Sequence, residues 1–389
     1  MPTPRTDVGS ATRATYVAFT STGFAFASWA SRIPQVKERL GLDPSELGLL
    51  LLSIAAGAVL SLPSSGPVVG RFGSRRAVAA TAVLAGVGLV TVAVGYRIGV
   101  VPVAVGLFLF GVATGTWDVA MNVQGAVVER RLGRAIMSRF HAGFSLGTVG
   151  GALVGAAMVA LDIGVTPHLL VVGVAVAAWV PFEVQRFLPD RDEPSSSSAT
   201  RDSLTAWREP RTLLIGVFVF AFAFSEGAGN DWISVAMIDD HGAAPAIGTL
   251  AFATFLAAMT GGRWVGPWLL DSYGRVPVIR GLTLVAVVGL VLFSFGPSTP
   301  VAFAGALLWG AGVSLGFPVG MSAGADEPAL AAPRVSVISS VGYCAFLAGP
   351  PLIGFLGQEV TVLHALAAVL ALLALAGLIA GALRPPAGT

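Results

Sequence analysis

Residues 66–76 read Gly66-Pro-Val-Val-Gly-Arg-Phe-Gly-Ser-Arg-Arg76, and residues 266–275 read Gly266-Pro-Trp-Leu-Leu-Asp-Ser-Tyr-Gly-Arg275. Both stretches open with Gly-Pro and carry a later glycine beside arginine. Each lies between the second and third apolar stretch of its half of the chain. This repetition indicates that a unit of several apolar helices was duplicated.

The composition indicates that lipid surrounds most of the chain. Apolar residues make up 55% of the 389 residues, charged residues make up 11%, and the mean hydropathy is +0.81. Soluble domains carry about 25% charged residues, roughly twice as many. The one cysteine, Cys344, forms no intrachain disulfide and says nothing about redox compartment.

Twelve apolar stretches are long enough to cross a membrane, since the hydrocarbon core needs about 20 residues of helix. We predict spans near residues 13–33, 45–65, 77–97, 101–128, 136–160, 165–188, 211–238, 244–266, 277–296, 300–324, 335–357 and 360–383. The first stretch also has features of a signal peptide, but the eleven spans after it favour an uncleaved helix.

One long polar stretch divides the chain. It runs from Pro189 to Pro210, includes Ser195–Ser198 and mixes both charges, as a solvated linker does. We therefore predict an N-terminal six-helix bundle over residues 1–188, a linker over 189–210 and a C-terminal six-helix bundle over 211–389. The fold class is an all-α membrane protein with twelve helices in two pseudo-symmetric bundles around a central cavity.

The basic residues predict the orientation. With the N-terminus inside, four of the 23 Lys and Arg residues fall outside, namely Arg32, Lys37, Arg39 and Arg97. The inner side holds the others, among them Arg71, Arg75, Arg76, Arg130, Arg131, Arg134, Arg191, Arg201 and Arg208. Loops rich in Lys and Arg stay cytoplasmic, so we predict a multi-pass membrane protein with both termini in the cytoplasm.

The repeated stretch resembles the loop motif of the major facilitator superfamily, in which Asp-x-x-Gly-Arg follows the second helix of each half. The resemblance covers the whole chain and implies a transporter that works by alternating access. It also implies gating roles on the cytoplasmic side for Arg71, Arg75, Asp271 and Arg275. Gly70 replaces the aspartate of the first copy, which favours a charge-based gate in the second half. Alternatively, the arginines anchor the loops to headgroups, which does not require the spaced glycines.

A narrower resemblance rests on residues 23–35 (Gly-Phe-Ala-Phe-Ala-Ser-Trp-Ala-Ser-Arg-Ile-Pro-Gln), 118–124 (Asp-Val-Ala-Met-Asn-Val-Gln) and 140–145 (Phe-His-Ala-Gly-Phe-Ser). These stretches resemble a bacterial branch, largely without assigned substrates, near the sugar permeases of the fucose–proton symporter type. This resemblance implies a location in the bacterial cytoplasmic membrane. Asp118 takes the position of an acid in the fourth helix of those permeases. Their acid in the first helix is missing, so the resemblance does not imply fucose as the substrate.

The family's drug–proton antiporters form another branch. They usually carry a basic residue in the fourth helix and a glycine-proline motif in the fifth. Residues 101–128 contain no Lys or Arg, and no proline follows Gly147 in its glycine-rich stretch. Both differences argue against a multidrug antiporter.

Ionisable groups inside a bilayer cost at least ~2.5 kcal/mol each and usually mark a transport pathway. Asp118 lies in the fourth predicted span, Glu226 lies near the middle of the seventh, and Asp231 lies toward its outer end. A carboxyl group away from water prefers its neutral form and can carry a proton. We therefore predict that Asp118 and Glu226 couple transport to protons. The alternative is that each acid is a structural group that joins two helices.

Positions in the hairpin of the fourth and fifth spans predict a polar cluster. Asn122 pairs in depth with His141, Asp118 pairs with Ser145, and Asn122 lies one turn from Asp118 on the same helical face. The cluster is a proton relay, a wall that hydrogen-bonds the solute, or a fastening between helices.

The seventh span carries Ser225-Glu-Gly-Ala-Gly-Asn-Asp-Trp232. Two glycines beside polar residues predict a weakened helix, as in the broken helices of transporter sites. Aromatic rings from the first and seventh spans suit the faces of a sugar-like ring. Trp29 and Trp232 are alternatively interfacial belt residues, and Asp231 alternatively faces an outer vestibule. The predicted substrate-binding residues are Phe26, Trp29, Asn122, His141, Ser145, Phe222, Asn230, Asp231, Trp232 and Tyr343.

Four glycines of the fifth span recur every four residues, at Gly143, Gly147, Gly151 and Gly155. Such a stripe lets a neighbouring helix approach closely, so we predict a packing role.

The sequence shows no nucleotide-binding loop, metal-ligand cluster or nucleophile–base pair. We expect no enzyme activity and no cofactor or metal. The leading hypothesis is a proton-driven secondary transporter of a small polar solute, with sugar-like compounds as one expected class. Proton-driven efflux of a drug or amphipathic metabolite is one alternative, and a non-transporting solute receptor of the same fold is another. The expected partners are the solute, protons and the lipid bilayer, with no nucleic acid, and the protein is expected to be a monomer.

Overall fold

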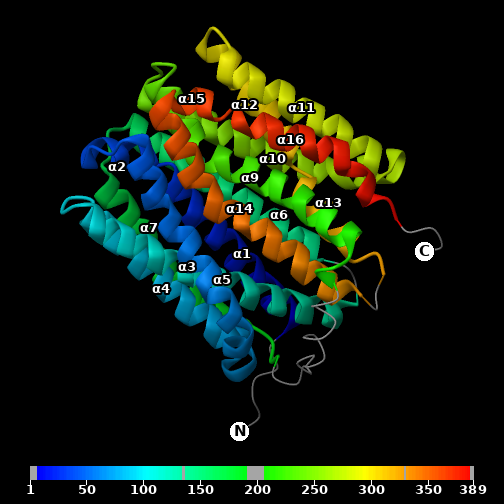
Figure 1. Cartoon of the computed structure of the whole chain (residues 1–389). Helices are drawn as coiled ribbons and strands as arrows, with labels where there is room; N and C mark the ends of the chain where they lie inside the picture. The colour runs from blue at the N-terminus through cyan, green and yellow to red at the C-terminus, as the bar shows by residue number, and fades with distance from the viewer. Residues whose placement is uncertain (1–6, 134–135, 191–205, 328–329, 386–389) are drawn as a thin grey trace. The chain divides into compact units, whose positions relative to one another are not determined.

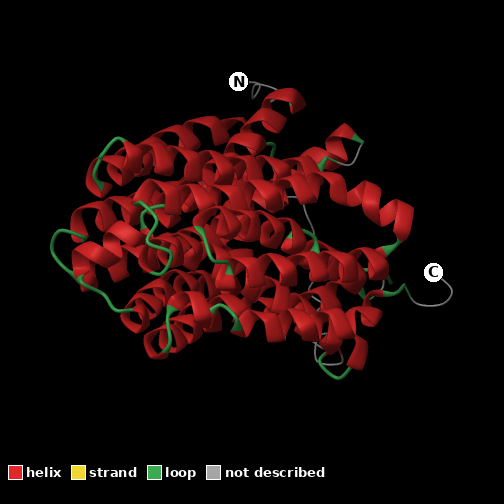
Figure 2. Cartoon of the chain, turned by 90° about the horizontal axis from the view of Figure 1, so that it is seen from above, coloured by secondary structure: helices red, strands yellow, loops and turns green. Residues whose placement is uncertain are grey.

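The computed structural model describes residues 7–133, 136–190, 206–327 and 330–385 (Figure 1). Arg134, Arg191 and Arg201, which contributed to the predicted orientation, lie outside these residues, as does most of the predicted linker 189–210. In the part that is described, regular structure is helical throughout, with loops and turns between the helices (Figure 2).

Each of the twelve predicted spans falls on helix. The first half contains α1 (Val8–Ala30), α2 (Ile33–Leu40), α3 (Pro44–Phe72), α4 (Ser74–Gly95), α5 (Val100–Leu132), α6 (Met137–Ala160), α7 (Val165–Glu183) and the 3₁₀ helix η1 (Val184–Arg186). The second half contains α9 (Pro210–Asp239), α10 (Pro245–Tyr273), α11 (Arg275–Phe295), α12 (Thr299–Val313), α13 (Gly316–Gly324), α14 (Ala331–Glu359), α15 (Val362–Ala365), α16 (Ala368–Ile379) and the 3₁₀ helix η2 (Ala380–Leu383).

Within the described residues, 11 helical segments are long and apolar enough to cross a membrane. The remaining predicted span, residues 13–33, corresponds to α1, which has 23 residues. Serine, threonine and Arg13 make α1 less apolar than the other long helices. Length and composition thus identify eleven of the twelve predicted spans. A long helix, α1, lies at the position of the remaining one.

The chain forms two compact units. One consists of Met1–Leu42 and Leu50–Ser195, and the other of Asp43–Leu49 and Ser196–Thr389. In the first unit α1 packs along α6, and α4 packs against α5 and α7. In the second unit α9 packs against α10, α13, α14 and α16, while α11 lies beside α12 and α16. Figure 1 shows α11, α12 and α16 running side by side. The boundaries predicted at residues 188 and 211 stay a prediction.

The repeated stretch makes the same backbone corner in both units. Gly73 joins α3 to α4 with φ 81° and ψ 154°, and Gly274 joins α10 to α11 with φ 78° and ψ 164°. L-residues with a side chain rarely adopt these angles, so both corners require glycine. The last glycine of each copy therefore has a conformational reason.

Close helix crossings are repeated as well. A Cβ atom at Gly88 would lie 2.8 Å from the carbonyl oxygen of Gly106, where α4 crosses α5. A Cβ atom at Gly289 would likewise lie 2.8 Å from the carbonyl oxygen of Gly305, where α11 crosses α12. Glycine at both positions lets two helix backbones touch. The two halves thus share their packing as well as their loop motif.

The predicted stripe on the fifth span has the expected packing role. A Cβ atom at Gly147 would lie 2.1 Å from the carbonyl oxygen of Thr20, and one at Gly151 would lie 2.5 Å from that of Phe24. Both carbonyls belong to α1, so the stripe on α6 is the surface along which α1 packs.

One prediction about helix continuity is wrong. The seventh span was expected to weaken at its glycines, but α9 is helical from Pro210 to Asp239. Gly227 and Gly229 instead leave room for the rings of Phe346 and Phe255, which would lie 3.4 and 2.6 Å from added Cβ atoms. The helical break falls in the tenth span, between the end of α12 and the start of α13.

Candidate functional site

Asp118 lies on α5, inside a membrane-spanning segment, and is half-buried. Asn122, one turn further along, donates from Nδ2 to the Asp118 carbonyl oxygen at 2.9 Å and to Oδ1 at 3.3 Å. In residues 7–133, 136–190, 206–327 and 330–385, no Lys, Arg or His forms an ion pair with this carboxyl group. An amide, rather than a cation, therefore holds the acid.

The other two members of the predicted cluster lie on α6. Ser145 is buried, whereas His141 is exposed, with the Phe19 ring edge-on at 5.2 Å between centroids. Phe19 belongs to α1, so His141 contacts that helix. The structure joins Asp118 and Asn122 directly, and a four-membered relay stays a prediction.

Glu226 is paired with an arginine that the sequence analysis did not select. Arg263 of α10 donates from Nη2 to both carboxylate oxygens of Glu226, at 3.2 and 3.1 Å. The Glu226 side chain is 20% exposed and the Arg263 side chain is 27% exposed, so the ion pair is only partly covered. Glu226 is therefore an anion neutralised by a neighbouring helix and differs in this from Asp118.

Arg263 also stabilises the break in the tenth span. Its Nε donates to the carbonyl oxygen of Ser314 at 3.2 Å, at the break between α12 and α13. A Cβ atom on the preceding residue, Gly262, would lie 2.3 Å from Ser314 Oγ, so glycine allows α10 to approach. A backbone carbonyl freed from helix within a membrane needs a new donor. One guanidinium thus links α9, α10 and the α12–α13 break.

Three further predicted residues follow Glu226 on α9. Asn230 lies one turn beyond it, and its Oδ1 atom is buried without a hydrogen-bond partner among the described residues. Asp231 is half-buried and Trp232 is fully buried. Beside the ion pair, Asn230 therefore has an unused acceptor.

The aromatic side chains among the predicted substrate-binding residues differ in how deeply they are buried. Trp29, Phe222 and Trp232 are each at most 1% exposed, so they are packed inside protein and do not face a membrane interface. A Cβ atom at Gly316 would lie 2.0 Å from the Phe222 ring, which indicates tight packing at the start of α13. Phe26 and Tyr343 are half-buried, and Tyr343 lies 6.2 Å from Phe346. Among these five, Phe26 and Tyr343 are the more accessible.

The predicted gating residues have different environments. Arg71 is exposed, with its guanidinium 5.5 Å from the Phe72 ring, and Arg75 and Asp271 are also exposed. Arg275 forms a 2.7 Å ion pair with Asp326.

Asp326, two residues after α13, also binds Arg211 at the start of α9, again at 2.7 Å. It therefore holds two arginines and is the acid that the sequence analysis missed at this corner.

The first unit supplies an acid at the corresponding corner. Asp190, four residues after η1, accepts a 2.7 Å hydrogen bond from the backbone N–H of Ser74 at the start of α4. A carboxylate at a helix N-terminus satisfies a free N–H group and interacts favourably with the helix dipole. The start of α4 is therefore capped by the chain itself.

A buried arginine–histidine pair was also missed. Arg32 is 1% exposed and donates to His168 Nδ1 at 2.8 Å and to the Ile163 carbonyl oxygen at 2.9 Å. Burial lowers the pKa of Arg32 to about 10, so it stays charged at neutral pH. His168 accepts through Nδ1 and therefore carries its proton on Nε2. The sequence analysis counted Arg32 among the outer basic residues and did not find its partners, because they lie far along the chain.

Arg263, in contrast, left a signal in the sequence. It is the one charged residue of the predicted span 244–266. A lone charge in an apolar stretch is expensive, so it predicts a buried partner. The sequence analysis counted Arg263 with the inner arginines and therefore did not identify Glu226 as its partner.

Known proteins match the chain over most of its length. It is 30% identical over 349 residues to an uncharacterised MFS-type transporter of Yersinia pestis, covering 88% of each chain. It is also 30% identical over 351 residues to an uncharacterised transporter of Sinorhizobium fredii, covering 88% of this chain and 90% of that protein.

Solved structures share the fold. The nucleoside transporter NupG has a TM-score of 0.77 at 14% identity, covering 95% of this chain and 97% of that one. The fucose:proton symporter FucP of E. coli has a TM-score of 0.63 at 15% identity, covering 95% of this chain and 98% of that one.

The family model of the Major Facilitator Superfamily matches residues 15–334. This match covers most of the chain and both copies of the glycine-arginine corner. The chain therefore belongs to the Major Facilitator Superfamily and is a multi-pass secondary transporter, related to bacterial transporters of this family.

Proposed function

We propose that the protein is a proton-coupled secondary transporter of a small polar solute, working by alternating access. The half-buried Asp118, held by Asn122 and by no cation among the described residues, is the observation that carries this proposal. A carboxyl group within a membrane helix costs less when protonated than when charged. Asp118 is therefore suited to take up a proton from one side and release it to the other.

Glu226 has a second role in the proposal. In this proposal, a proton that reaches Glu226 breaks its ion pair with Arg263 and releases the guanidinium. Arg263 would then interact with the solute, beside the unpartnered amide oxygen of Asn230. In this proposal, Arg263 and the predicted residues that are not fully buried bind the solute. These predicted residues are Phe26, Asn122, His141, Asn230, Asp231 and Tyr343.

Two of the structurally similar proteins support a polar solute. NupG is a nucleoside transporter and FucP is a fucose:proton symporter. Nucleosides and fucose are small hydroxylated compounds, and FucP is a symporter that also uses the proton. At 14% and 15% identity these proteins share the fold, so a sugar-like solute for this chain remains part of the proposal.

The remaining roles extend the same mechanism. We propose that the glycine-arginine corners gate the cytoplasmic side and that the protein is monomeric in a bacterial cytoplasmic membrane, with both termini inside. The excess of arginine on one side supports the orientation. The proposed gating residues are Arg71, Arg75, Asp271 and Arg275.

Replacing Asp118 with Asn tests the coupling. A solute is first identified by a thermal-shift screen of the purified protein against metabolites, since ligands of the folded state raise its stability. In proteoliposomes, Asp118→Asn should abolish accumulation of this solute driven by a pH gradient. Exchange of labelled for unlabelled solute should continue, because exchange needs no net proton movement.

Asp162→Asn is the matched control. Asp162 is an exposed turn residue with φ 54°, a conformation that Asn also accepts. The Asp162→Asn variant should accumulate solute like the wild type. Full accumulation by Asp118→Asn would assign Asp118 a structural role. Comparing right-side-out with everted vesicles gives the direction, and efflux replaces uptake if only everted vesicles accumulate solute.

A further inference from the structure

The helix α9 has one partly covered face near the middle of its length, and that face is polar. Over residues 225–237 of this helix, four positions are half-buried, namely Glu226, Gly227, Asn230 and Asp231. All other positions of this stretch are fully buried, and most of them are apolar. Polar side chains in a membrane helix face the interior of the bundle or water. The half-buried positions therefore form a surface for water or solute and not for lipid.

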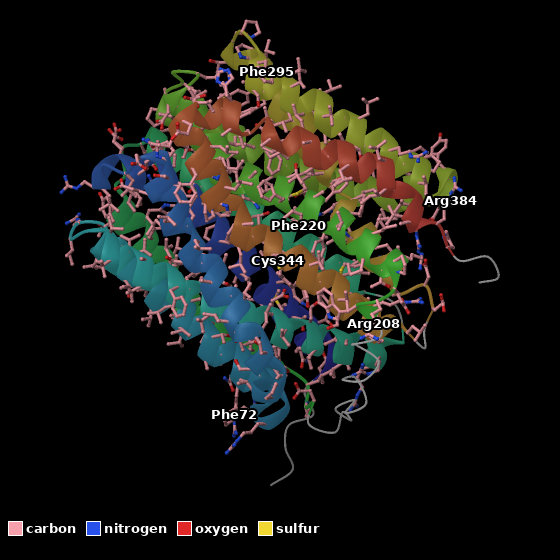
Figure 3. The ribbon with its side chains drawn as sticks, in the orientation of Figure 1. Phe72, Arg208, Phe220, Phe295, Cys344 and Arg384 are labelled. Atoms are coloured by element: carbon pink, nitrogen blue, oxygen red, sulfur yellow. The ribbon has the colours of Figure 1, made fainter. Side chains whose placement is uncertain are left out.

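The two sides of this face contact different helices of the second unit. Glu226 and Asn230 are one turn apart and lie toward α10, whose Arg263 pairs with Glu226. The other side lies toward α14, which packs along α9. Figure 3 shows this packing, with Phe220 of α9 beside Cys344 of α14.

The side toward α14 presents an unpaired acid next to aromatic rings. Gly227 and Asp231 are one turn apart on this side, and an added Cβ at Gly227 would lie 3.4 Å from the ring of Phe346, a half-buried residue. The Tyr343 ring lies 6.2 Å from the Phe346 ring. In the part of the chain that the structure describes, Asp231 forms no hydrogen bond or ion pair. Carboxylates and the faces of aromatic rings both attract cations.

The charges of this region leave one negative group without a counter-ion. Within the described helices α9, α10 and α14, three charged residues lie more than one turn from a helix end, namely Glu226, Asp231 and Arg263. Arg263 is already paired with Glu226. Because an unpaired charge inside a membrane is expensive, Asp231 requires either a proton or a cation.

Asn230 favours a solute that brings hydrogen-bond donors. Its Oδ1 atom is buried without a partner among the described residues, directly beside Asp231 in the chain. A proton on Asp231 would neutralise that carboxyl group and leave the Asn230 oxygen and the Phe346 ring unused. A protonated amine offers three N–H donors and no acceptor, and a neighbouring hydroxyl group offers one more donor. A hydroxylated amine thus matches both acceptors and the ring.

We propose that the solute is a small hydroxylated compound with a protonated amino group, an amino sugar in chemical class, and that Asp231 binds this amino group. The inference rests on the proposed transport of a polar solute and names the charge which that solute carries. The ring of Phe346 contacts the amino group, and Asn230 accepts a hydrogen bond from a hydroxyl group.

Binding of matched amino and neutral sugars to the full-length protein tests the proposal. The purified protein in detergent at neutral pH is titrated with glucosamine, galactosamine or mannosamine, and with the parent sugar and the N-acetylated form of each. The thermal midpoint and titration calorimetry report binding. One or more of the amino sugars should bind about tenfold more tightly than both of its neutral forms, because hydrogen bonds to charged groups are the stronger ones.

Replacing Asp231 with Asn removes the charge and keeps the size of the side chain. Asp231→Asn should weaken binding of that amino sugar about tenfold or more and leave its neutral forms unchanged. Phe346→Leu, which removes the ring and keeps an apolar side chain, should weaken the amino sugar about threefold and its neutral forms less.

Two further variants separate loss of charge from misfolding. Asp231→Glu keeps the carboxylate and should retain the preference for the amino sugar. Glu359→Gln removes an exposed carboxylate at the end of α14 and should bind every probe like the wild type.

Three outcomes would overturn the proposal. Equal or tighter binding of the neutral forms would remove the role of the positive charge. Wild-type binding of the amino sugar by Asp231→Asn would show that Asp231 is not its counter-ion. A protein that binds none of the amino sugars would reject this class of solute.

The proposed function is judged separately, by the proteoliposomes that carry Asp118→Asn. Proton-driven accumulation of a neutral sugar, unchanged in Asp231→Asn, would uphold the proposed function and overturn this inference. An amino sugar that binds through Asp231 but is not accumulated would uphold this inference and overturn the proposed function.

Discussion

At the scale of single residues, two acids within the membrane helices, Asp118 and Glu226, are held in different ways. Asp118 accepts a hydrogen bond from the amide of Asn122, whereas Glu226 is neutralised by Arg263. Asp118 thus has a neutral partner, and Glu226 has a cationic one. The two acids therefore have separate proposed roles, although the sequence analysis treated them alike.

A double-mutant cycle measures the Glu226–Arg263 interaction. Glu226→Gln and Arg263→Gln should each destabilise the protein, because each leaves one charge in a membrane helix without its counter-ion. The double variant should recover part of the loss, with a coupling free energy of about 0.5–3 kcal/mol.

Thermal midpoints in detergent report the changes for the four proteins. Additive losses in the double variant would show that the two groups do not interact energetically. Arg280→Gln, which removes a charge outside this pair, is the control and should not couple to Glu226→Gln.

Glu209 provides a pH test outside the membrane spans. A hydrogen bond from Arg334 holds the pKa of Glu209 below its ordinary value. A carboxyl group with a lowered pKa stabilises the folded state above its unfolded pKa of about 4.3 and loses this effect as pH falls through the lowered value.

Glu209→Gln should therefore lower the thermal midpoint at neutral pH, and the difference from the wild type should shrink below about pH 4. Midpoints measured across this range check the sign. A difference that is constant with pH would mean that the charge of Glu209 does not stabilise the fold.

At the scale of helices, glycine decides where elements touch. Gly289 lies at a crossing where an added Cβ would be 2.3 Å from the backbone nitrogen of Trp309, while nothing lies within 4 Å of a Cβ at Gly281. Both glycines are on α11. The same residue type thus has a packing role at one position and none at the other.

Gly289→Ala should destabilise the protein by about 1–3 kcal/mol, because overpacking forces α11 and α12 apart. Gly281→Ala should be neutral or stabilising by up to ~1 kcal/mol, because alanine favours helix. Thermal unfolding of the two variants in the same detergent compares them directly. Equal effects would mean that the crossing tolerates a methyl group.

At the scale of the whole molecule, the chain repeats its construction. The corners at Gly73 and Gly274 have the same backbone angles, and the crossings of α4 with α5 and of α11 with α12 have the same spacing. Duplication predicts this agreement, since the two copies inherited one set of helix contacts. Charges differ more between the copies, since Asp271 of the second copy stands where the first copy has Gly70.

The single cysteine permits a test of orientation. Cys344→Ser gives a cysteine-free protein, into which cysteine is placed at Arg76 or Arg97, both exposed. In right-side-out vesicles, a membrane-impermeant maleimide should label the cysteine at position 97 and not the one at position 76. Basic loops stay in the cytoplasm, which is the reason for this expectation. The opposite labelling would reverse the proposed topology.

The sequence by itself determined the class of molecule, the helical spans and the duplicated corner. Each of these rests on local information, because every apolar stretch must form its own hydrogen bonds in lipid. It also identified Asp118 and Glu226 as unusual charges, and the stripe at Gly147 and Gly151 as a packing surface.

Only the tertiary structure decided the partners of those residues. Glu226 meets Arg263, Arg275 meets Asp326 and Arg32 meets His168, in each case across at least 37 positions of the chain. The continuity of α9 and the break after α12 were also decided by packing, because glycine either breaks a helix or admits a neighbour. Which of the two occurs depends on side chains from other helices, and spacing along one helix does not contain that information.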